Sequence, residues 1–393
     1  MKNYILKSVS SPVLERFPTL RKRLAATSEP LPVCLGADLE KAGVCVAAQV
    51  GLGTPISLGL LSREETSALV ATLVQKGHRV AVGVEACGFG WRWQEQLRQT
   101  AATVYTFAPE PLTGRRKTNR RDAAALALLT SDRFVHDNKR AGRVVREPSP
   151  LEQQRRFLTR HRSHLVALRG KLEAHGRGLL LDFGRLDYPD CWWGKKMWPR
   201  LVAQLQASGE EWLLAELTRQ RRLTCELHQE IRTMDTRLAA LSDELLPDVL
   251  PGGLGELTAL TLFVEVMNWN RFSNRKQAGS YIGCCPTEHS TGPGQRLGAI
   301  DRQGNRRLRS ALTETVWRLT RWEKDWRGFA KWGALLQDKN VGGVRRKKAV
   351  IACVRLLFID LWRLHTGRAT LAELGFHGRN RKAPEEAAEA IAA

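Results

Sequence analysis

Three short motifs place acidic side chains where they can share one site. Asp38 and Glu85 each end a predicted strand, and Asp122 opens an Ala/Leu-rich helix, with Asn119 one turn earlier on the same face. Carboxylates at the ends of neighbouring strands and on a facing helix can meet in space. Such a cluster repels itself unless hard cations neutralise it. We therefore expect Mg²⁺, or Mn²⁺ in its place, and the chemistry of a phosphoryl displacement.

Each of these acids also has a purely structural interpretation. Asp38 alone is typical of a turn or cap, and Asp122 alone of a helix start that the macrodipole favours. Glu85 is harder to explain in this way, because it is flanked by apolar residues and an unpaired buried carboxylate is costly. Only their joint occurrence favours a shared site.

The charge of the chain indicates a nucleic-acid partner. There are 62 Lys and Arg residues against 40 Asp and Glu, a net charge of +22 over 393 residues. Membrane surfaces also attract cations, so charge alone is a weak signal. Clusters near the acidic motifs and in the C-terminal third are predicted to contact phosphates. Their residues are Arg115, Arg116, Lys117, Arg120, Arg121, Arg296, Arg302, Arg306, Arg307 and Arg309.

Several protein classes are disfavoured by the sequence. No apolar stretch approaches the ~18 residues of a membrane span, and the N-terminus has no long apolar region of a signal peptide. The eight cysteines lack CxxC spacing, which argues against a zinc site or a disulfide framework. We expect a cytoplasmic protein without membrane contact, associated with the bacterial nucleoid when it binds DNA.

The first part of the chain predicts an α/β fold. Residues 1–30 are basic and irregular, and residues 31–148 alternate apolar strands with helices. Ser62 and Glu65 form a capping box for a helix that runs to about Lys76, and a further helix is expected over Trp91 to Gln99. This pattern, with a hairpin at its start, suits a ribonuclease-H-like domain.

The remainder predicts mainly helices. In residues 149–245, leucines recur every seven residues from Leu151 to Leu172, and a second stripe starts at Leu227, which indicates a coiled-coil hairpin. Two helices of one globular bundle are an equally good interpretation. Residues 246–370 form a separate, mostly helical domain, and residues 371–393 a tail. A series of arginines gives the first long helix a predicted cationic face: Arg155, Arg156, Arg160, Arg162 and Arg169.

Taken together, the motifs resemble the DEDD insertion-sequence transposases. The three acidic motifs match that family in order, and the block from Tyr281 to Pro286, His289-Ser290-Thr291-Gly292 and Gly304 to Arg309 is similar to its C-terminal transposase domain. The similarity runs from about Val33 to Leu361. It implies a RuvC-like N-terminal domain in which Asp38, Glu85 and Asp122 are catalytic and bind Mg²⁺, and Ser290 as the nucleophile that links covalently to DNA. The third acidic position of the pattern is Asn119 here, whose amide oxygen can still ligate a hard cation.

The resemblance also implies partners. The family is similar to RNA-guided recombinases, in which an element-encoded bridge RNA pairs with donor and target DNA. A composite site then forms between subunits, so we expect a homo-oligomer, a dimer or tetramer joined through the coiled coil. Two alternatives remain open: a RuvC-type structure-selective nuclease in which Ser290 is incidental, and a non-catalytic RNA- or DNA-binding derivative, which Asn119 makes conceivable.

Overall fold

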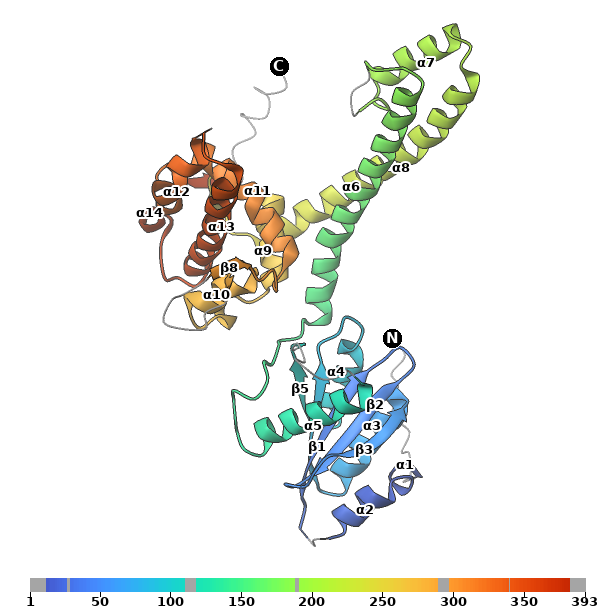
Figure 1. Cartoon of the computed structure of the whole chain (residues 1–393), viewed down its shortest axis with the longest axis vertical. Helices are drawn as coiled ribbons and strands as arrows, with labels where there is room; N and C mark the ends of the chain where they lie inside the picture. Colours follow the sequence, from blue (N-terminus) through green and yellow to red (C-terminus); the bar gives the residue numbers. More distant parts are fainter. Residues whose placement is uncertain are drawn as a thin grey trace. The chain divides into compact units, whose positions relative to one another are not determined.

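The computed structural model of the chain describes residues 12–26, 29–109, 118–187, 191–288, 297–338 and 340–381. It contains two compact units, Met1–Glu147 and Pro148–Ala393. The division falls beside residue 148, where the sequence predicts the first domain to end. Each unit has its own hydrophobic core. Figure 1 draws the elements of both units and labels most of them.

The first unit is built on a mixed five-stranded sheet in the order β3-β2-β1-β4-β5. Strands β1, β2 and β3 form an antiparallel meander, whereas β4 and β5 continue parallel to β1. Their bounds are Pro32–Leu39 (β1), Val44–Val50 (β2), Ile56–Leu61 (β3), Arg79–Glu85 (β4) and Thr103–Phe107 (β5). The predicted α/β class is confirmed, and the RuvC-like identity of the domain stays a prediction.

Helices cover both faces of this sheet (Figure 1). Alternate residues of β1, β2 and β4 pack against α2 (Pro18–Leu24), α3 (Arg63–Gln75) and α4 (Trp91–Gln99). The opposite face meets α5 (Asn119–Phe134), through Cys45, Ala47, Ala123 and Ala127. The capping box of α3 is present as predicted, and α4 has the predicted bounds. The expectation that residues 1–30 are irregular is wrong from residue 12 on, because α1 (Pro12–Glu15) and α2 form and Leu20 is fully buried.

The second unit begins with two long helices, α6 (Pro150–Asp182) and α8 (Glu211–Leu245), joined through the shorter α7 (Met197–Ala207). Ion pairs at successive levels show that α6 and α8 run antiparallel: Arg155 pairs with Glu244, and Arg162 with Asp235. The predicted hairpin is therefore confirmed. Its coiled-coil packing stays a prediction, since Leu165 of the leucine stripe is buried but Leu151 is 53% exposed.

The rest of the unit is a helical bundle around α13 (Gly343–His365), whose core is extensive. The other helices are α9 (Glu256–Val266), α10 (Arg275–Tyr281), α11 (Arg306–Trp322), α12 (Arg327–Gln337) and α14 (Leu371–Leu374), with a short 3-10 turn at Trp269–Arg271. Two small antiparallel ladders complete it: β6 (Val249–Pro251) with β9 (Gly378–Asn380), and β7 (Pro286–Glu288) with β8 (Leu297–Ile300).

The predicted start of the tail at residue 371 is too early. Leu374 is buried, Phe376 stacks on Trp326, and β9 pairs with β6. The chain therefore belongs to the bundle as far as Arg381, the last residue that the structure describes. None of the described helices is both long and apolar enough to cross a lipid bilayer.

Candidate functional site

Two glycines bring α5 unusually close to the sheet. A Cβ atom on Gly36 of β1 would lie 2.0 Å from the backbone oxygen of Ala123, and one on Gly83 of β4 would lie 1.9 Å from Thr130 Oγ1. A side chain at position 36 would require the backbone of α5 to move, and one at position 83 would clash with the side chains of Thr130 and Phe107. The first turn of α5 is therefore held against β1 at backbone distance.

Asp38 and Glu85 lie on the same face and at the same edge of the sheet. Ala37 of β1 is in register with Val84 of the parallel strand β4, and the two acids are the next residues along. Side chains alternate along a strand, so both acids share the face of the two glycines, which α5 covers. Both are partly exposed. The structure thus brings together two of the three predicted carboxylates at one sheet edge.

Asp122 occupies the first turn of α5 and is the most buried acid of the set, at 7% exposure. Neither of its carboxylate oxygens has a hydrogen-bond partner within the described residues. Burial of a carboxylate without hydrogen-bond partners destabilises the fold, because no protein contact offsets the free energy of desolvation. Unpartnered carboxylate oxygens of this kind are expected of a residue that binds a cation.

The pKa of the Cys45 thiol reflects the charged groups around it. Cys45 lies on β2, directly opposite Asp38 in the antiparallel ladder. Burial raises the pKa of its thiol, and the negative charges of Asp38, Glu40 and Asp122 raise it further, while Arg120 opposes them. All four charged groups therefore act on one point between the end of β1 and the start of α5.

Glu40 is a member of this group that the sequence reasoning missed. The side-chain amide of Asn119 donates a hydrogen bond to its carboxylate. Glu40 stands in the turn after β1, where its backbone N–H donates to the Gly43 carbonyl oxygen at 2.9 Å. The signal that could have identified Glu40 is its position two residues after Asp38 in the same motif. Asn119 thus contacts a carboxylate from another element.

These residues fit a hard divalent cation in the types of their donor atoms, which are carboxylate and amide oxygens. The unpartnered oxygens of Asp122 agree with this fit. In the part of the chain that the structure describes, however, no three His, Cys, Asp or Glu side chains converge closely enough to hold one ion. The acids are neighbours at one edge of the sheet, without forming a closed cage.

The predicted phosphate contacts near this site are only partly described. Arg120 and Arg121 are exposed on the first turn of α5, beside Asp122. Arg115, Arg116 and Lys117 lie outside the described residues. Two arginines and the most buried acid of the site therefore occupy adjacent positions of one helix.

Ser290 and Arg296 also lie outside the described residues, within the connection from β7 to β8. The two ends of this connection are held together. Thr287 Oγ1 donates to the Ala299 carbonyl oxygen at 3.0 Å, and the backbone N–H of Asp301 donates to the Cys285 carbonyl oxygen at 2.8 Å. The described residues on either side of the segment that contains Ser290 are therefore paired in a two-stranded ladder.

The C-terminal arginines of the prediction fall into two groups. Arg302 and Arg306 are exposed. Arg309 instead donates to the Ile282 carbonyl oxygen at 2.7 Å, and Arg307 Nη2 donates to Ser163 Oγ at 2.9 Å. The last two hold elements of the bundle together, whereas the first two face solvent.

A buried carboxylate that the sequence did not single out organises this unit. Glu265 of α9 is fully buried. It accepts hydrogen bonds from Arg160 Nε and Nη2, both at 2.8 Å, from Arg156 Nη2 at 3.1 Å and from Asn305 Nδ2 at 2.9 Å. Burial opposes its ionisation, but the bonds from Arg160 and Asn305 and the charge of Arg156 outweigh burial and lower the pKa of Glu265 to about 2. It therefore links α6, α9 and α11.

These contacts correct the predicted cationic face of α6. Its arginines pair with carboxylates of the same unit: Arg155 with Glu244, Arg156 and Arg160 with Glu265, Arg162 with Asp235 and Arg169 with Glu173. The charge of an arginine held in this way is already partly neutralised by its carboxylate partner. The series is an internal network rather than an open phosphate track.

Comparisons with known proteins agree on one class. Residues 251–331 match the model of the family described as Transposase IS116/IS110/IS902. The chain is 28% identical over 244 residues to a probable family 20 transposase of Pseudomonas aeruginosa, covering 59% of this chain and 68% of that protein. It is 26% identical over 245 residues to the transposase for insertion sequence element IS1111A of Coxiella burnetii, covering 59% of this chain and 63% of that one.

Proposed function

Because the chain belongs to the IS116/IS110/IS902 transposase family and is a transposase that acts on DNA, we propose that it cuts and rejoins DNA with two sets of residues. Ser290 is the nucleophile, and Asp38, Glu85 and Asp122 form a Mg²⁺-dependent acidic site. The observation that supports the first assignment is the extent of the family match, since residues 251–331 include β7, β8 and, between them in the sequence, Ser290.

In the proposed reaction, the Ser290 hydroxyl loses its proton and its oxygen forms a bond to the scissile phosphorus. The bond from that phosphorus to one deoxyribose oxygen breaks, and the released oxygen takes up a proton. One phosphodiester is exchanged for another. Rejoining to a different strand by the reverse step therefore needs no external energy source.

The acidic site supports this reaction from the first unit. Its strand order, β3-β2-β1-β4-β5, and the acids at the ends of β1 and β4 favour the RuvC-like interpretation. When bound there, Mg²⁺ supplies the charge that polarises phosphate oxygens. Asp38, Glu85 and Asp122 would hold it, and the Asn119 amide oxygen and the Glu40 carboxylate would be neighbouring donors. The unpartnered, buried oxygens of Asp122 are the observation that supports a cation at this edge.

Guidance by a structured RNA and assembly into a homo-oligomer complete the proposal. The net charge of +22 suits a protein that holds more than one nucleic-acid strand. On the α6–α8 hairpin, Leu151, Phe157 and Leu168 remain 53%, 57% and 37% exposed, which favours burial against another subunit. Purification with an RNA transcribed from the flanking DNA, and light scattering of the free protein, test these two parts separately.

Trapping on a nicked suicide DNA that carries the element ends tests the nucleophile. We expect a covalent adduct that peptide mapping places on Ser290, and no adduct with Ser290→Ala. Ser310→Ala, which removes an exposed hydroxyl from α11, is the matched control and should keep the adduct. An adduct on another residue rejects the assignment. Metal-dependent cleavage that survives Ser290→Ala would favour the alternative, a RuvC-type nuclease.

A further inference from the structure

A large basic cavity lies in the second unit, beside the β7–β8 ladder, whose strands flank Ser290 in the sequence. Its volume is about 1060 Å³, and α10, α12, α13 and the β7–β8 ladder line it. Pro286 on β7 and Gly298, Ala299 and Ile300 on β8 contribute to its wall. Both strands that lead into the Ser290 connection therefore border the cavity.

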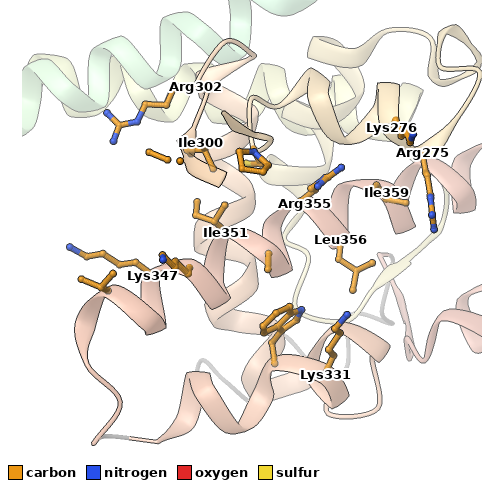
Figure 2. Close-up of a pocket in the computed structure, with 18 residues that line it drawn as sticks. Arg275, Lys276, Ile300, Arg302, Lys331, Lys347, Ile351, Arg355, Leu356 and Ile359 are labelled. Carbon is orange, nitrogen blue, oxygen red and sulfur yellow. The ribbon is translucent and has the colours of Figure 1, made fainter. Parts of the chain in front are cut away.

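The cavity combines a cationic rim with an apolar floor. Seven of its lining residues are lysine or arginine, and no acidic residue of the described chain lines it. Figure 2 shows Arg302 and Lys347 on one side and Arg275 and Lys276 on the other, with Ile300, Ile351 and Leu356 between them. The rim therefore attracts anions, while the floor favours an uncharged, flat or apolar group.

The rim cations have few charge partners among the residues that the structure describes. Arg275, Arg302, Lys331, Lys347 and Arg355 form no ion pair with any described carboxylate, in contrast to the arginines around Glu265. The Nε of Arg355 is buried and has no described hydrogen-bond partner. Like charges gathered around one cavity raise the energy of the free protein, and an anionic ligand relieves that repulsion.

An aromatic ring is available beside these cations. Trp332 lines the cavity and is half-buried, and the Lys331 ammonium group lies 5.4 Å from its ring centroid. A second cavity of about 600 Å³, which contains Arg363 and Arg368, shares Arg275 and Ile359 with the first. The cationic lining thus continues beyond the first cavity, as needed for a chain of phosphates rather than a single one.

We propose that this cavity holds an unpaired stretch of DNA, with its phosphates on the cationic rim and one base stacked on the Trp332 ring. A paired duplex keeps its bases stacked inside, so its backbone would meet the rim but leave the apolar floor unused. An unpaired nucleotide satisfies both parts at once, because every base has an apolar face that stacks on an aromatic ring. The choice of DNA rests on the transposase class and not on the proposed role of Ser290.

Equilibrium binding to the full-length protein in EDTA tests this site without any strand cleavage, so an inactive acidic cluster or serine does not affect the result. The probe is a short, fluorescently labelled oligothymidylate, compared with the same length of duplex DNA and of oligouridylate. We expect Trp332→Ala to weaken binding of single-stranded DNA about tenfold, since stacking on one aromatic ring contributes on the order of 1–3 kcal/mol per base. Duplex binding should stay within about twofold, because no base leaves the stack.

Trp322→Ala is the matched control for the aromatic ring, since Trp322 is 64% exposed and lies outside the cavity. Trp332 also packs against the core, so a second variant keeps the test decisive if Trp332→Ala unfolds. The double variant Arg302→Gln/Lys347→Gln changes two exposed side chains. It should reduce the slope of log affinity against log salt for single strands by ~1.4. The control pair Arg321→Gln/Lys324→Gln, which removes two exposed charges elsewhere, should leave that slope unchanged.

Equal losses for single-stranded and duplex DNA in the cavity variants would overturn the proposal, as would equal effects of the cavity and control variants. A loss confined to oligouridylate would assign the cavity to RNA and reject DNA. Displacement of the oligothymidylate by polyglutamate as efficiently as by unlabelled DNA would show that the cavity takes acidic peptides and does not recognise bases.

Discussion

The side-chain amide of Asn119, in the first turn of α5, donates a hydrogen bond to the carboxylate of Glu40, in the turn after β1. An aspartate at position 119 would instead place two carboxylates in contact. The amide therefore holds a neighbouring carboxylate near the end of β1 without repelling it. Glu40 adds a negative charge beside Asn119, which itself carries none.

Asn119→Asp tests this arrangement. We expect lower stability in EDTA, because two carboxylates then face each other, and stronger stabilisation by added Mn²⁺ or Mg²⁺, because a cation relieves the repulsion. Thermal unfolding with and without metal measures both effects. Asn119→Asp/Glu40→Gln, which restores one amide and one acid in exchanged positions, should return the stability in EDTA to that of the parent. A metal response identical in all three proteins would place Glu40 and Asn119 outside the site.

Asp122→Ala should separate function from stability. The change removes a buried carboxylate without partners, which stabilises the fold, but it also removes a favourable negative charge at the N-terminus of α5, which destabilises it. The first effect is larger, so we expect the free energy of unfolding in EDTA to rise by about 1 kcal/mol. Strand cleavage and Mn²⁺ binding by calorimetry should be lost.

Asp360→Ala is the structural counterpart. Asp360 is fully buried but accepts hydrogen bonds from Trp326 Nε1 at 2.9 Å and from Arg327 Nε at 3.0 Å. Its removal should cost about 2–4 kcal/mol and leave Mn²⁺ binding unchanged. A comparable loss of stability in Asp122→Ala would show that Asp122 is structural too.

Glu265 predicts an acid-sensitive second unit. Its pKa is lowered from 4.5 to about 2, so its ionised form stabilises the fold fully above pH 4.5, and this contribution is lost as the pH falls towards 2. Glu265→Gln should lower the free energy of unfolding at pH 7 by roughly 3 kcal/mol, because three arginines lose their counter-charge. The difference between parent and variant should shrink as the pH falls from 4.5 to 2.

Chemical denaturation at several pH values measures this difference. Glu226→Gln provides the control, since Glu226 is an exposed partner of Arg222 at 3.5 Å and its loss should cost less than about 1 kcal/mol at any pH. A pH-independent gap between parent and Glu265→Gln would contradict the lowered pKa.

Gly36→Ala should disturb the acidic site without touching an acid. The new Cβ would lie 2.0 Å from the Ala123 backbone oxygen, so α5 must shift and carry Asp122 with it. We expect a loss of about 1–3 kcal/mol and weaker Mn²⁺ binding. Gly88→Ala, where a Cβ meets nothing within 4 Å, is the matched control and should change neither. Unaltered metal binding in Gly36→Ala would break the link between helix packing and the site.

Features that depend on local chemistry were predictable from the sequence. The capping box of α3 and the acids at the ends of β1 and β4 follow from residue types a few positions apart. Residues joined only by the tertiary fold were not predictable in this way. Glu40 contacts a residue 79 positions away, and Arg160 pairs with Glu265 across 105 positions. An arginine series reads as an open cationic face until its partners on other helices are known.

Short elements without periodicity escaped prediction for a related reason. β9 is three residues long and all three residues are exposed, so no hydrophobic alternation marks it. It forms because the backbone of β6 offers it partners. A strand that forms only through main-chain hydrogen bonds leaves no side-chain pattern from which it could be predicted.

The α6–α8 hairpin is fastened by different chemistry at its two ends. Near its base, Arg156 and Arg160 bind Glu265. At its tip, Trp192 closes an apolar cluster with Leu180, Leu201 and Leu213. A helix of 33 residues spans about 50 Å. A rotation of the hairpin about its base would have to break the hydrogen bonds that Arg156 and Arg160 donate to Glu265, so this carboxylate sets the angle at which α6 leaves the bundle.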